Sequence, residues 1–355
     1  MACIAGIRAF KRKKLPILLK LPLPHGIVLG LMKPSFLQVA TRSVVQWFNA
    51  DFHATGEASK VKDVDKINWV RSIPFLILHL GCLGVFIVGW SWTAVATAAA
   101  LYFVRMFAIT GIYHRYFSHR TFKTSRPAQF VFALLGASAT QRGPLWWAAN
   151  HREHHRNSDT PADPHSPVYY SFLRSHMGWF MCNRFYATQY NRIQDFARFP
   201  ELVWLNRYDK AVPVALAVLL YLCGLGLEFT APSLGVSGLQ LLVWGFVLST
   251  TLLFHGTATI NSLSHMYGSK RYDTGDESRN NVWLAIITLG EGWHNNHHQH
   301  MGTVRQGFYW WEIDVTYYIL KSLSWFGIIW DLKPVPVIAY DRNEQLPYKK
   351  MASAA

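Results

Sequence analysis

Two long stretches of the chain carry no lysine or arginine, at residues 72–104 and 211–269. The first lies in an almost entirely apolar segment, 73–112, which has room for two membrane crossings of about 20 residues each. A turn near residues 89–92 divides this segment, and an uncharged link at 230–237 divides the second stretch. Because unpaired backbone is not tolerated in lipid, the pattern predicts four transmembrane helices in two hairpins, over about 73–90, 92–112, 211–229 and 238–260.

The distribution of basic residues predicts how these helices are oriented. The two links inside the hairpins lack Lys and Arg, whereas the N-terminal segment, residues 113–210 and residues 270–355 are rich in them. Short loops rich in Lys and Arg stay on the cytoplasmic side, and an even number of crossings puts all three segments there. We therefore expect an all-α integral membrane protein, with both termini and a helical cap on the cytoplasmic face.

The composition supports a membrane protein over the other classes. Hydrophobic residues make up 51% of the chain and charged residues 15%, against about 25% charged in soluble domains, which excludes a disordered chain. The four cysteines are widely spaced, which excludes a disulfide scaffold. A net charge of +15 often indicates nucleic acid, but all 35 basic residues avoid the two apolar stretches. Because charge is costly inside a bilayer, we expect lipid and not nucleic acid as the partner.

The two ends of the chain differ from the apolar middle. Residues 1–50 carry eight basic residues and no acid, which favours a basic arm with an interfacial helix over 1–70, lying on an anionic leaflet. The alternative is a disordered tail. We expect one integral domain over 71–335 and a C-terminal tail over 336–355.

Nine of the sixteen histidines form a pattern that packing explains poorly. Two lie in HRYFSH at 114–119, three in HREHH at 151–155, one closes NSLSH at 261–265, and three lie in HNNHH at 294–298. Residues three and four apart share a helix face, so each HxxHH cluster can point its imidazoles into one pocket. Asn261 and His265 also share a face. Nine imidazoles exceed what one ion accepts, so the pattern predicts a site for two metal ions. Imidazole suits iron, copper, zinc and nickel, and a redox-active pair suggests oxygen chemistry.

These residues resemble the membrane-bound fatty acid desaturases, specifically the stearoyl-CoA (Δ9) branch. The resemblance rests on the HRYFSH, NHREHH, NSLSH and GEGWHNNHH segments, in that order, and covers roughly residues 70 to 335. It implies four transmembrane helices carrying a cytosolic helical cap that holds a diiron centre. The implied iron ligands are His114, His119, His151, His154, His155, His265, His294, His297 and His298, with Asn261 holding an iron through water. The resemblance does not divide these ligands between the ions.

The resemblance also implies the reaction. The iron pair (Fe2+/Fe3+) activates O2 with two external electrons, and one hydrogen leaves each of two adjacent methylenes to give a cis double bond, most simply at Δ9 of an acyl-CoA. A rigid apolar tunnel is needed to fix the position of the chain, and Trp146, Trp147, Trp179 and Trp293 are candidates for its lining. No HPGG or CxxC motif is present, so we expect a separate electron donor such as ferredoxin, cytochrome b5 or rubredoxin with its reductase.

Two departures leave the group that carries the acyl chain open. Ala149 and Asn150 stand where animal enzymes of the branch have a basic residue and an acid that contact coenzyme A, and Asn183-Arg184 replaces a basic pair. A phospholipid-linked or carrier-protein-linked chain is therefore an alternative to acyl-CoA. Hydroxylation by the same centre is the nearest rival reaction, and a non-enzymatic lipid-binding membrane protein is the remote one. We expect Asp163, His165 and Glu291 to support ligands or cap turns, Asp273 and Asp276 to be loop residues, and His176 to lie outside the site.

Overall fold

The computed structural model describes residues 36–52 and 65–346, which belong to one compact unit and are mostly helical. Four helical segments are long and apolar enough to span a membrane: Trp69–Val88, Trp92–Ser118, Ala211–Thr230 and Gly238–His265. They confirm the four predicted segments as helices. The second and fourth continue beyond the predicted ends at 112 and 260, so that each carries one histidine past its predicted end, His114 and His265.

The first hairpin turns where the sequence predicts. It comprises α2 (Trp69–Gly81), η2 (Cys82–Gly84) and α3 (Val85–Val88), then α4 (Trp92–Phe107) and its wider-wound continuation η3 (Ala108–Ser118). Gly89 ends α3 with φ +67°, a conformation that glycine adopts without strain. The Ser91 side chain then accepts a hydrogen bond from the Ala94 amide and caps α4.

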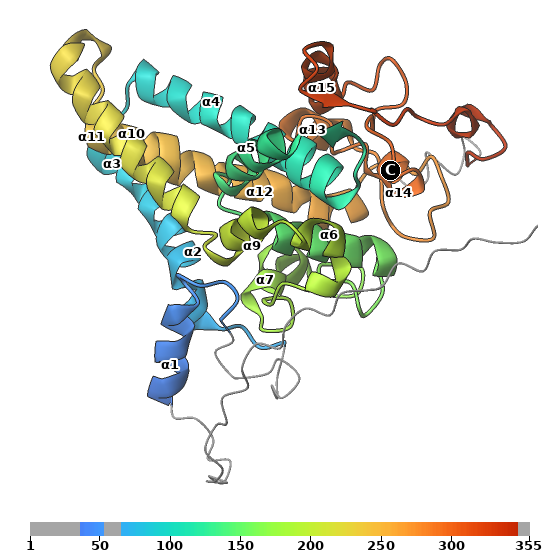
Figure 1. Cartoon of the computed structure of the whole chain (residues 1–355), viewed down its shortest axis with the longest axis horizontal. Helices are drawn as coiled ribbons and strands as arrows, with labels where there is room; N and C mark the ends of the chain where they lie inside the picture. Colours follow the sequence, from blue (N-terminus) through green and yellow to red (C-terminus); the bar gives the residue numbers. More distant parts are fainter. Residues whose placement is uncertain (1–35, 53–64, 347–355) are drawn as a thin grey trace, which may run out of the picture. The chain divides into compact units, whose positions relative to one another are not determined.

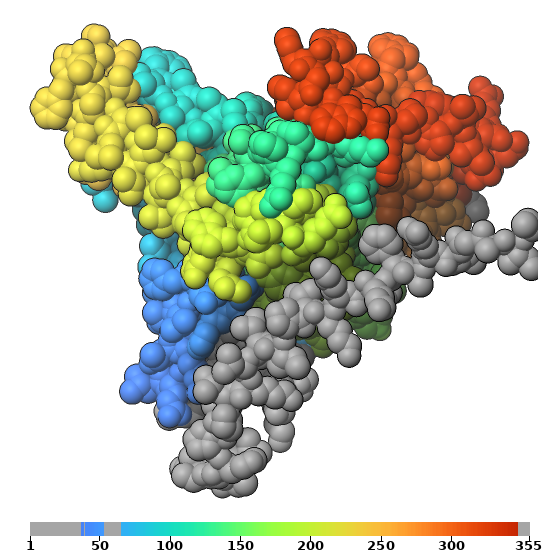
Figure 2. Space-filling view, viewed as in Figure 1, coloured from blue at the N-terminus to red at the C-terminus, as the bar shows by residue number. Residues whose placement is uncertain are grey.

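The second hairpin packs closely on itself and against the first. It consists of α10 (Ala211–Thr230), η6 (Pro232–Leu234), α11 (Gly238–Gln240), η7 (Leu241–Leu248), α12 (Ser249–Ser262) and η8 (Leu263–His265). A Cβ atom at Gly224 would lie 2.6 Å from the Ser237 carbonyl oxygen, so only glycine lets the two halves approach this closely. The hairpin tips lie side by side (Figure 2), where the Gln240 side-chain amide donates to the Val88 carbonyl at 2.9 Å.

The remaining helices gather at the ends of the spans opposite the hairpin tips (Figure 1). A short antiparallel sheet pairs β1 with β2, with Lys123 opposite Trp330. α1 is a helix within the predicted basic arm, but residues 1–35 and 53–64 of that arm, and 347–355 of the tail, lie outside the described residues. The elements are α1 (Phe36–Val45), β1 (Lys123–Thr124), α5 (Arg126–Ala137), α6 (Pro144–Asn157), η4 (Arg174–Gly178), α7 (Trp179–Met181), η5 (Tyr190–Arg192), α8 (Gln194–Ala197), α9 (Pro200–Arg207), α13 (Val282–Ile287), α14 (His294–Gln299), α15 (Val315–Trp325), β2 (Ile329–Trp330) and η9 (Val337–Tyr340).

The main core lies where α5, α6 and α9 cover η3. It is built from fully buried apolar residues such as Ile112 of η3, Leu145 of α6 and Leu205 of α9. A Cβ atom at Gly136 of α5 would lie 2.1 Å from the ring of Tyr113, so this glycine is required for the close approach of α5 to η3. The core thereby fixes the end of the second span against α6. These two elements carry four of the first five predicted ligands, and the fifth, His119, directly follows the span.

The charge in the middle of the second span, that of Arg105, faces protein, not lipid. Arg105 is 1% exposed. Its guanidinium donates to Thr250 Oγ1 at 2.7 Å, to Ser249 Oγ, and to the Ser138 carbonyl at 3.3 Å. These contacts tie α4 to α12.

Candidate metal centre

All nine predicted histidines converge, and they form two adjoining groups of side chains whose ring nitrogens lie within 4.8 Å of one another in each group. α6 and α14 each carry three, η3 carries His114, η8 carries His265, and His119 lies just after η3. The first group is His114, His119, His151, His155 and His297, and the second is His154, His265, His294 and His298.

Each HxxHH cluster is divided between the two groups. On α6, His151 and His155 join the first group, while His154 joins the second. On α14 the division is reversed, because His294 and His298 join the second group and His297 the first. Positions four apart lie almost in line on a helix, and the position three residues after the first is rotated away from them. Each helix therefore lies between the groups and serves both.

The ring nitrogens are spaced as the ligands of a shared ion would be. When a first-row metal ion binds two nitrogens, each at about 2.1 Å, and the two bonds form a right angle at the metal, the nitrogens lie about 3 Å apart. Nε2–Nε2 distances in the first group are 2.8 Å for His119–His151, 3.0 Å for His151–His155, 2.9 Å for His155–His297 and 3.0 Å for His114–His297, and in the second group 3.1 Å for His265–His294.

Three ring nitrogens of the second group are buried without a hydrogen-bond partner: Nδ1 of His294 and two Nε2 atoms. The two Nε2 atoms are those of His154 and His298. A buried polar atom without a partner costs free energy, and a metal ion would satisfy the lone pairs of both Nε2 atoms at once. The residues present therefore fit a pair of imidazole-bound metal ions.

In four of these rings a carboxylate contacts Nδ1, which leaves Nε2 as the nitrogen available to a metal ion. Asp163 lies 3.0 Å from Nδ1 of His154, Asp159 2.9 Å from Nδ1 of His265, and Asp276 2.5 Å from Nδ1 of His298. Glu291 contacts Nδ1 of His114. A carboxylate at Nδ1 keeps the proton there and leaves the Nε2 lone pair for a metal. The arrangement thus fixes both the tautomer and the direction of each ring.

The electrostatics favour neutral, metal-binding imidazoles. Burial lowers the pKa of five rings well below the usual value, so that they are neutral at pH 7, each with one N–H and one free lone pair. In contrast, the Asp163 carboxylate outweighs the effect of burial on His154 and raises the pKa of that ring. The five neutral rings are His119, His151, His155, His294 and His297.

The carboxylates themselves stay ionised. Burial raises the pKa of Asp159, but its hydrogen bonds and its charge interaction with His265 outweigh burial and lower the pKa to about 2. For the same kind of reason, His154 and His298 hold the pKa of Asp163 and Asp276 below the usual range. These acids therefore contribute negative charge near the two groups over the whole physiological pH range.

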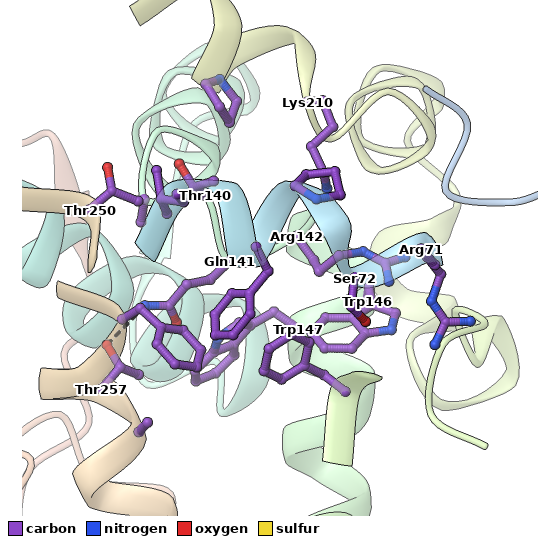
Figure 3. Close-up of a pocket in the computed structure, with 18 of the residues that line it drawn as sticks. Arg71, Ser72, Thr140, Gln141, Arg142, Trp146, Trp147, Lys210, Thr250 and Thr257 are labelled. Carbon is purple, nitrogen blue, oxygen red and sulfur yellow. Dashed lines mark hydrogen bonds between the residues drawn. The ribbon is translucent and has the colours of Figure 1, made fainter. Parts of the chain in front are cut away.

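An apolar cavity of about 430 Å³ leads to the first group (Figure 3). Its lining includes His151, and three of the four candidate tryptophans, Trp146, Trp147 and Trp179. Trp293 is instead buried elsewhere and donates to the Ile313 carbonyl. A smaller cavity of about 40 Å³, which touches His114, His154 and His294, shares with the larger one a wall that includes Trp147, His151, Thr257 and Asn261.

The comparisons with known proteins agree with this geometry. The model of the family described as "Fatty acid desaturase" matches residues 90–324. The chain belongs to the fatty acid desaturase family. It is 36% identical over 271 residues to the sn-1 stearoyl-lipid 9-desaturase of Anabaena variabilis, covering 76% of this chain and 94% of the relative. It is also 36% identical over 296 residues to an acyl-CoA 5-desaturase of Anemone leveillei (80% and 88%), and 34% over 273 residues to the sn-2 palmitoyl-lipid 9-desaturase of Nostoc sp. (74% and 89%).

Several further residues of this desaturase that the sequence singled out lie at the site. Asn261 lines both cavities. His165 packs beside His154, with ring centroids 4.4 Å apart, and burial lowers its pKa to about 3. His176 lies outside both groups, where it contacts Ser262 and His255.

Sequence reasoning missed two of the supporting carboxylates. Asp159 was not considered, and Asp276 was interpreted only as a loop residue; it is in a loop, but its carboxylate contacts His298. Asp159 has φ +54°, unusual for a residue other than glycine. It accepts hydrogen bonds from Ser166 Oγ and the Glu277 amide. Asp159 pairs with His265, 106 residues away. No local sequence pattern marks this contact, apart from an aspartate four residues after His155.

Replacing Asp276 with alanine is expected to weaken metal binding about 10–100-fold, the usual effect of losing a carboxylate behind a ligating imidazole. His298 would lose the acceptor that fixes its Nδ1 proton. The measurement is metal retained per chain during titration with a chelator. Asp273→Ala, three residues away in the same loop and exposed, is the control and should bind as the wild type does. Equal retention by both variants would refute this role for Asp276.

Proposed function

We propose that this desaturase introduces a cis double bond at Δ9 of a saturated fatty acyl chain, with two irons held by the nine histidines. The observation that carries the proposal is the apolar cavity that reaches the paired histidine groups. The Δ9 position is supported by the resemblance of the histidine motifs and by relatives named as 9-desaturases. The names of the relatives include both lipid-linked and coenzyme A-linked substrates.

The chemistry requires an oxidant that side chains do not provide. An unactivated C–H bond has no pKa that a general base could use, and the iron pair, when bound, supplies the oxidising power with O2. The balance is one –CH2–CH2– unit, one O2, two electrons and two protons, giving one cis –CH=CH– unit and two waters. The electrons come from a separate donor, for which ferredoxin, cytochrome b5 or rubredoxin with its reductase are the candidates.

The chain's own residues orient the substrate and exclude water. Trp147 lies in the wall shared by the two cavities, and its ring stacks on His151 at a centroid distance of 5.1 Å. The side-chain amide of Gln141, another lining residue, donates to Thr257 Oγ1 at 2.9 Å (Figure 3), so these two polar groups partly satisfy each other. We infer that an apolar chain passes between these residues, which fixes the pair of methylenes presented to the metals.

We also propose that the metal centre and both termini lie on the cytoplasmic side. The support is the absence of Lys and Arg from the links 89–91 and 230–237, together with the positive-inside rule. This places the centre where a soluble donor protein can reach it, and the basic cytoplasmic segments suit the docking of an acidic one.

The test is expression in a bacterium that makes no Δ9 products aerobically, followed by gas chromatography–mass spectrometry with derivatisation that locates double bonds. A new cis-9 monoene is the expected result, and co-expression of a ferredoxin with its reductase ensures electron supply. A hydroxylated chain would replace the proposed reaction by its nearest rival. Purified protein free of iron and without product would contradict the proposal altogether.

A further inference from the structure

The larger cavity runs from a cluster of cations to the metal centre. Arg71, Arg142 and Lys210 line one part of it, while His151 and Asn261 line another. Figure 3 shows the three cationic side chains toward one side of the cavity and Thr250 and Thr257 toward the other. A molecule with an anionic head and an apolar tail would match this polarity.

The cation cluster has an excess of positive charge. Arg142 and Lys210 share one carboxylate, that of buried Asp209, at 2.7 and 2.8 Å. Arg71 is buried, and its guanidinium donates to one amide oxygen and two backbone carbonyl oxygens, all neutral. Three cations thus lie near one paired carboxylate, and buried charge without compensation is costly. An anionic group bound in the cavity would offset this excess.

The loop that presents Arg142 is strained. Thr140 and Arg142 have φ values of +62° and +72°, in the left-handed region that residues other than glycine rarely adopt. Both line the cavity, between the end of α5 and the start of α6. Strained residues persist where the surroundings hold them and tend to cluster at ligand-binding sites. This is a second indication, independent of charge, that the cation-lined end binds something.

The same cavity reaches the surface that faces lipid. Val214 and Val218 of α10 line it, although they are 60% and 52% exposed. Pro74 and Leu78 of α2 line it as well, and α2 and α10 both pack against η7. The outer face of α10, yellow in Figure 2, is uncovered in that view. The cavity therefore opens sideways between two membrane spans.

The cations lie at the boundary of the same two spans. Arg71 is the third residue of α2, and Lys210 immediately precedes α10. A lateral opening with cations at its polar end matches the geometry of a membrane phospholipid, whose phosphate lies at the boundary and whose chains lie in the bilayer. Coenzyme A also carries phosphates, but an acyl-CoA arrives from water and has no need of an opening between spans.

We propose that this slot between α2 and α10 admits a membrane phospholipid sideways, with its phosphate at Arg142 and Lys210 and one acyl chain directed to the metal centre. The inference rests on the proposed acyl-chain desaturation and deepens it, because it names acyl phospholipids as the substrate class.

Binding is tested without turnover. The full-length protein is reconstituted in vesicles of phosphatidylcholine that contain a phosphatidylcholine with a photoreactive diazirine in its acyl chain, and crosslinks are mapped by mass spectrometry. We expect crosslinks to residues of the slot. Val218→Trp, which fills the slot, should reduce them about tenfold, the scale of losing a well-packed apolar site. Leu219→Trp, on the adjacent exposed position outside the cavity, is the control and should crosslink as the wild type does.

The headgroup contact is tested separately. Lys210→Gln should weaken crosslinking about tenfold, the scale of one charge-assisted hydrogen bond, whereas Lys321→Gln, exposed on α15, should not. Slot crosslinks that are indifferent to both Val218→Trp and Lys210→Gln would overturn the proposal.

Turnover then distinguishes the two sources of phosphate. Deuterated stearoyl chains are supplied either in phosphatidylcholine or as stearoyl-CoA, and deuterated monoene is measured in each. Conversion of the lipid-linked chain alone supports the inference. Conversion of stearoyl-CoA alone overturns it while leaving the proposed desaturation intact. If the wild type converts neither chain, the desaturation proposal fails on its own test, and the crosslinks still decide whether the slot binds phospholipid.

Discussion

Replacing His154 with alanine is expected to abolish desaturation and to reduce the iron content of a protein that still inserts and folds. Nε2 of His154 lies in the second histidine group without a protein partner, and Nδ1 is held by Asp163. Because the ring is a candidate ligand and not a supporting residue, we expect the loss of activity to exceed the roughly 100-fold effect of removing a support. Product analysis and metal content per purified chain measure the two effects together.

The control for that variant is a histidine that belongs to neither group and lies directly after α14, the other helix that carries three of the nine histidines. His300→Gln meets this need, since the His300 ring packs against Tyr272 and Phe308 instead. It should retain iron and activity. Wild-type activity in His154→Ala would refute the assignment of the second group as a metal site, whereas loss of iron in both variants would point to a general effect on folding.

The transmembrane part of the fold was predictable because the bilayer imposes a simple rule. Uncharged apolar runs of about 20 residues have few alternatives to a spanning helix, and the turn at Gly89 fell where the sequence indicated. The helices continue past the predicted crossings, to Ser118 and His265, and most of the added residues are buried in the protein.

The convergence of the nine histidines was predictable, but their division into two groups was not. Spacing along a helix shows which imidazoles share a face, and it suggested that each HxxHH cluster serves one pocket. Which group His154 or His297 joins depends on how α6 and α14 cross, and the crossing is fixed by tertiary packing. The same holds for Asp159 and Asp276, whose partners, His265 and His298, lie 106 and 22 residues further along the chain.

The cation cluster was equally hidden in the sequence. Arg71, Arg142 and Lys210 stand in three separate segments. Arg71 and Lys210 look like ordinary basic residues at the membrane boundary, and Arg142 looks like one of many basic residues in the segment 113–210. Only the fold shows that Arg142 and Lys210 share Asp209 and that all three line one cavity. The departures at Ala149 and Asn150 raised the question of the acyl carrier from the sequence, and the slot provides a structural reason to favour a lipid.

Arg115→Met is expected to destabilise the protein by about 3–5 kcal/mol, the usual cost of breaking a buried ion pair by removing one partner. The Arg115 guanidinium is fully buried and lies 3.0 Å from carboxylate oxygens of both Asp314 and Glu291. Without it, two buried acids lose their cation, and Glu291 would hold His114 less firmly. Thermal unfolding in detergent, followed by tryptophan fluorescence, should show a midpoint lowered by roughly 10 °C.

The matched control is Arg126→Met, the same substitution in a surface pair. Arg126 contacts Glu201 in two places, at 2.7 and 2.8 Å, so the number of bonds lost is comparable. Water screens the surface pair and solvates the carboxylate left behind, so this variant should unfold close to the wild-type temperature. If the two variants unfolded alike, burial would not be what makes Arg115 important. A lower iron content in Arg115→Met alone would further indicate that the buried ion pairs position His114 for the metal.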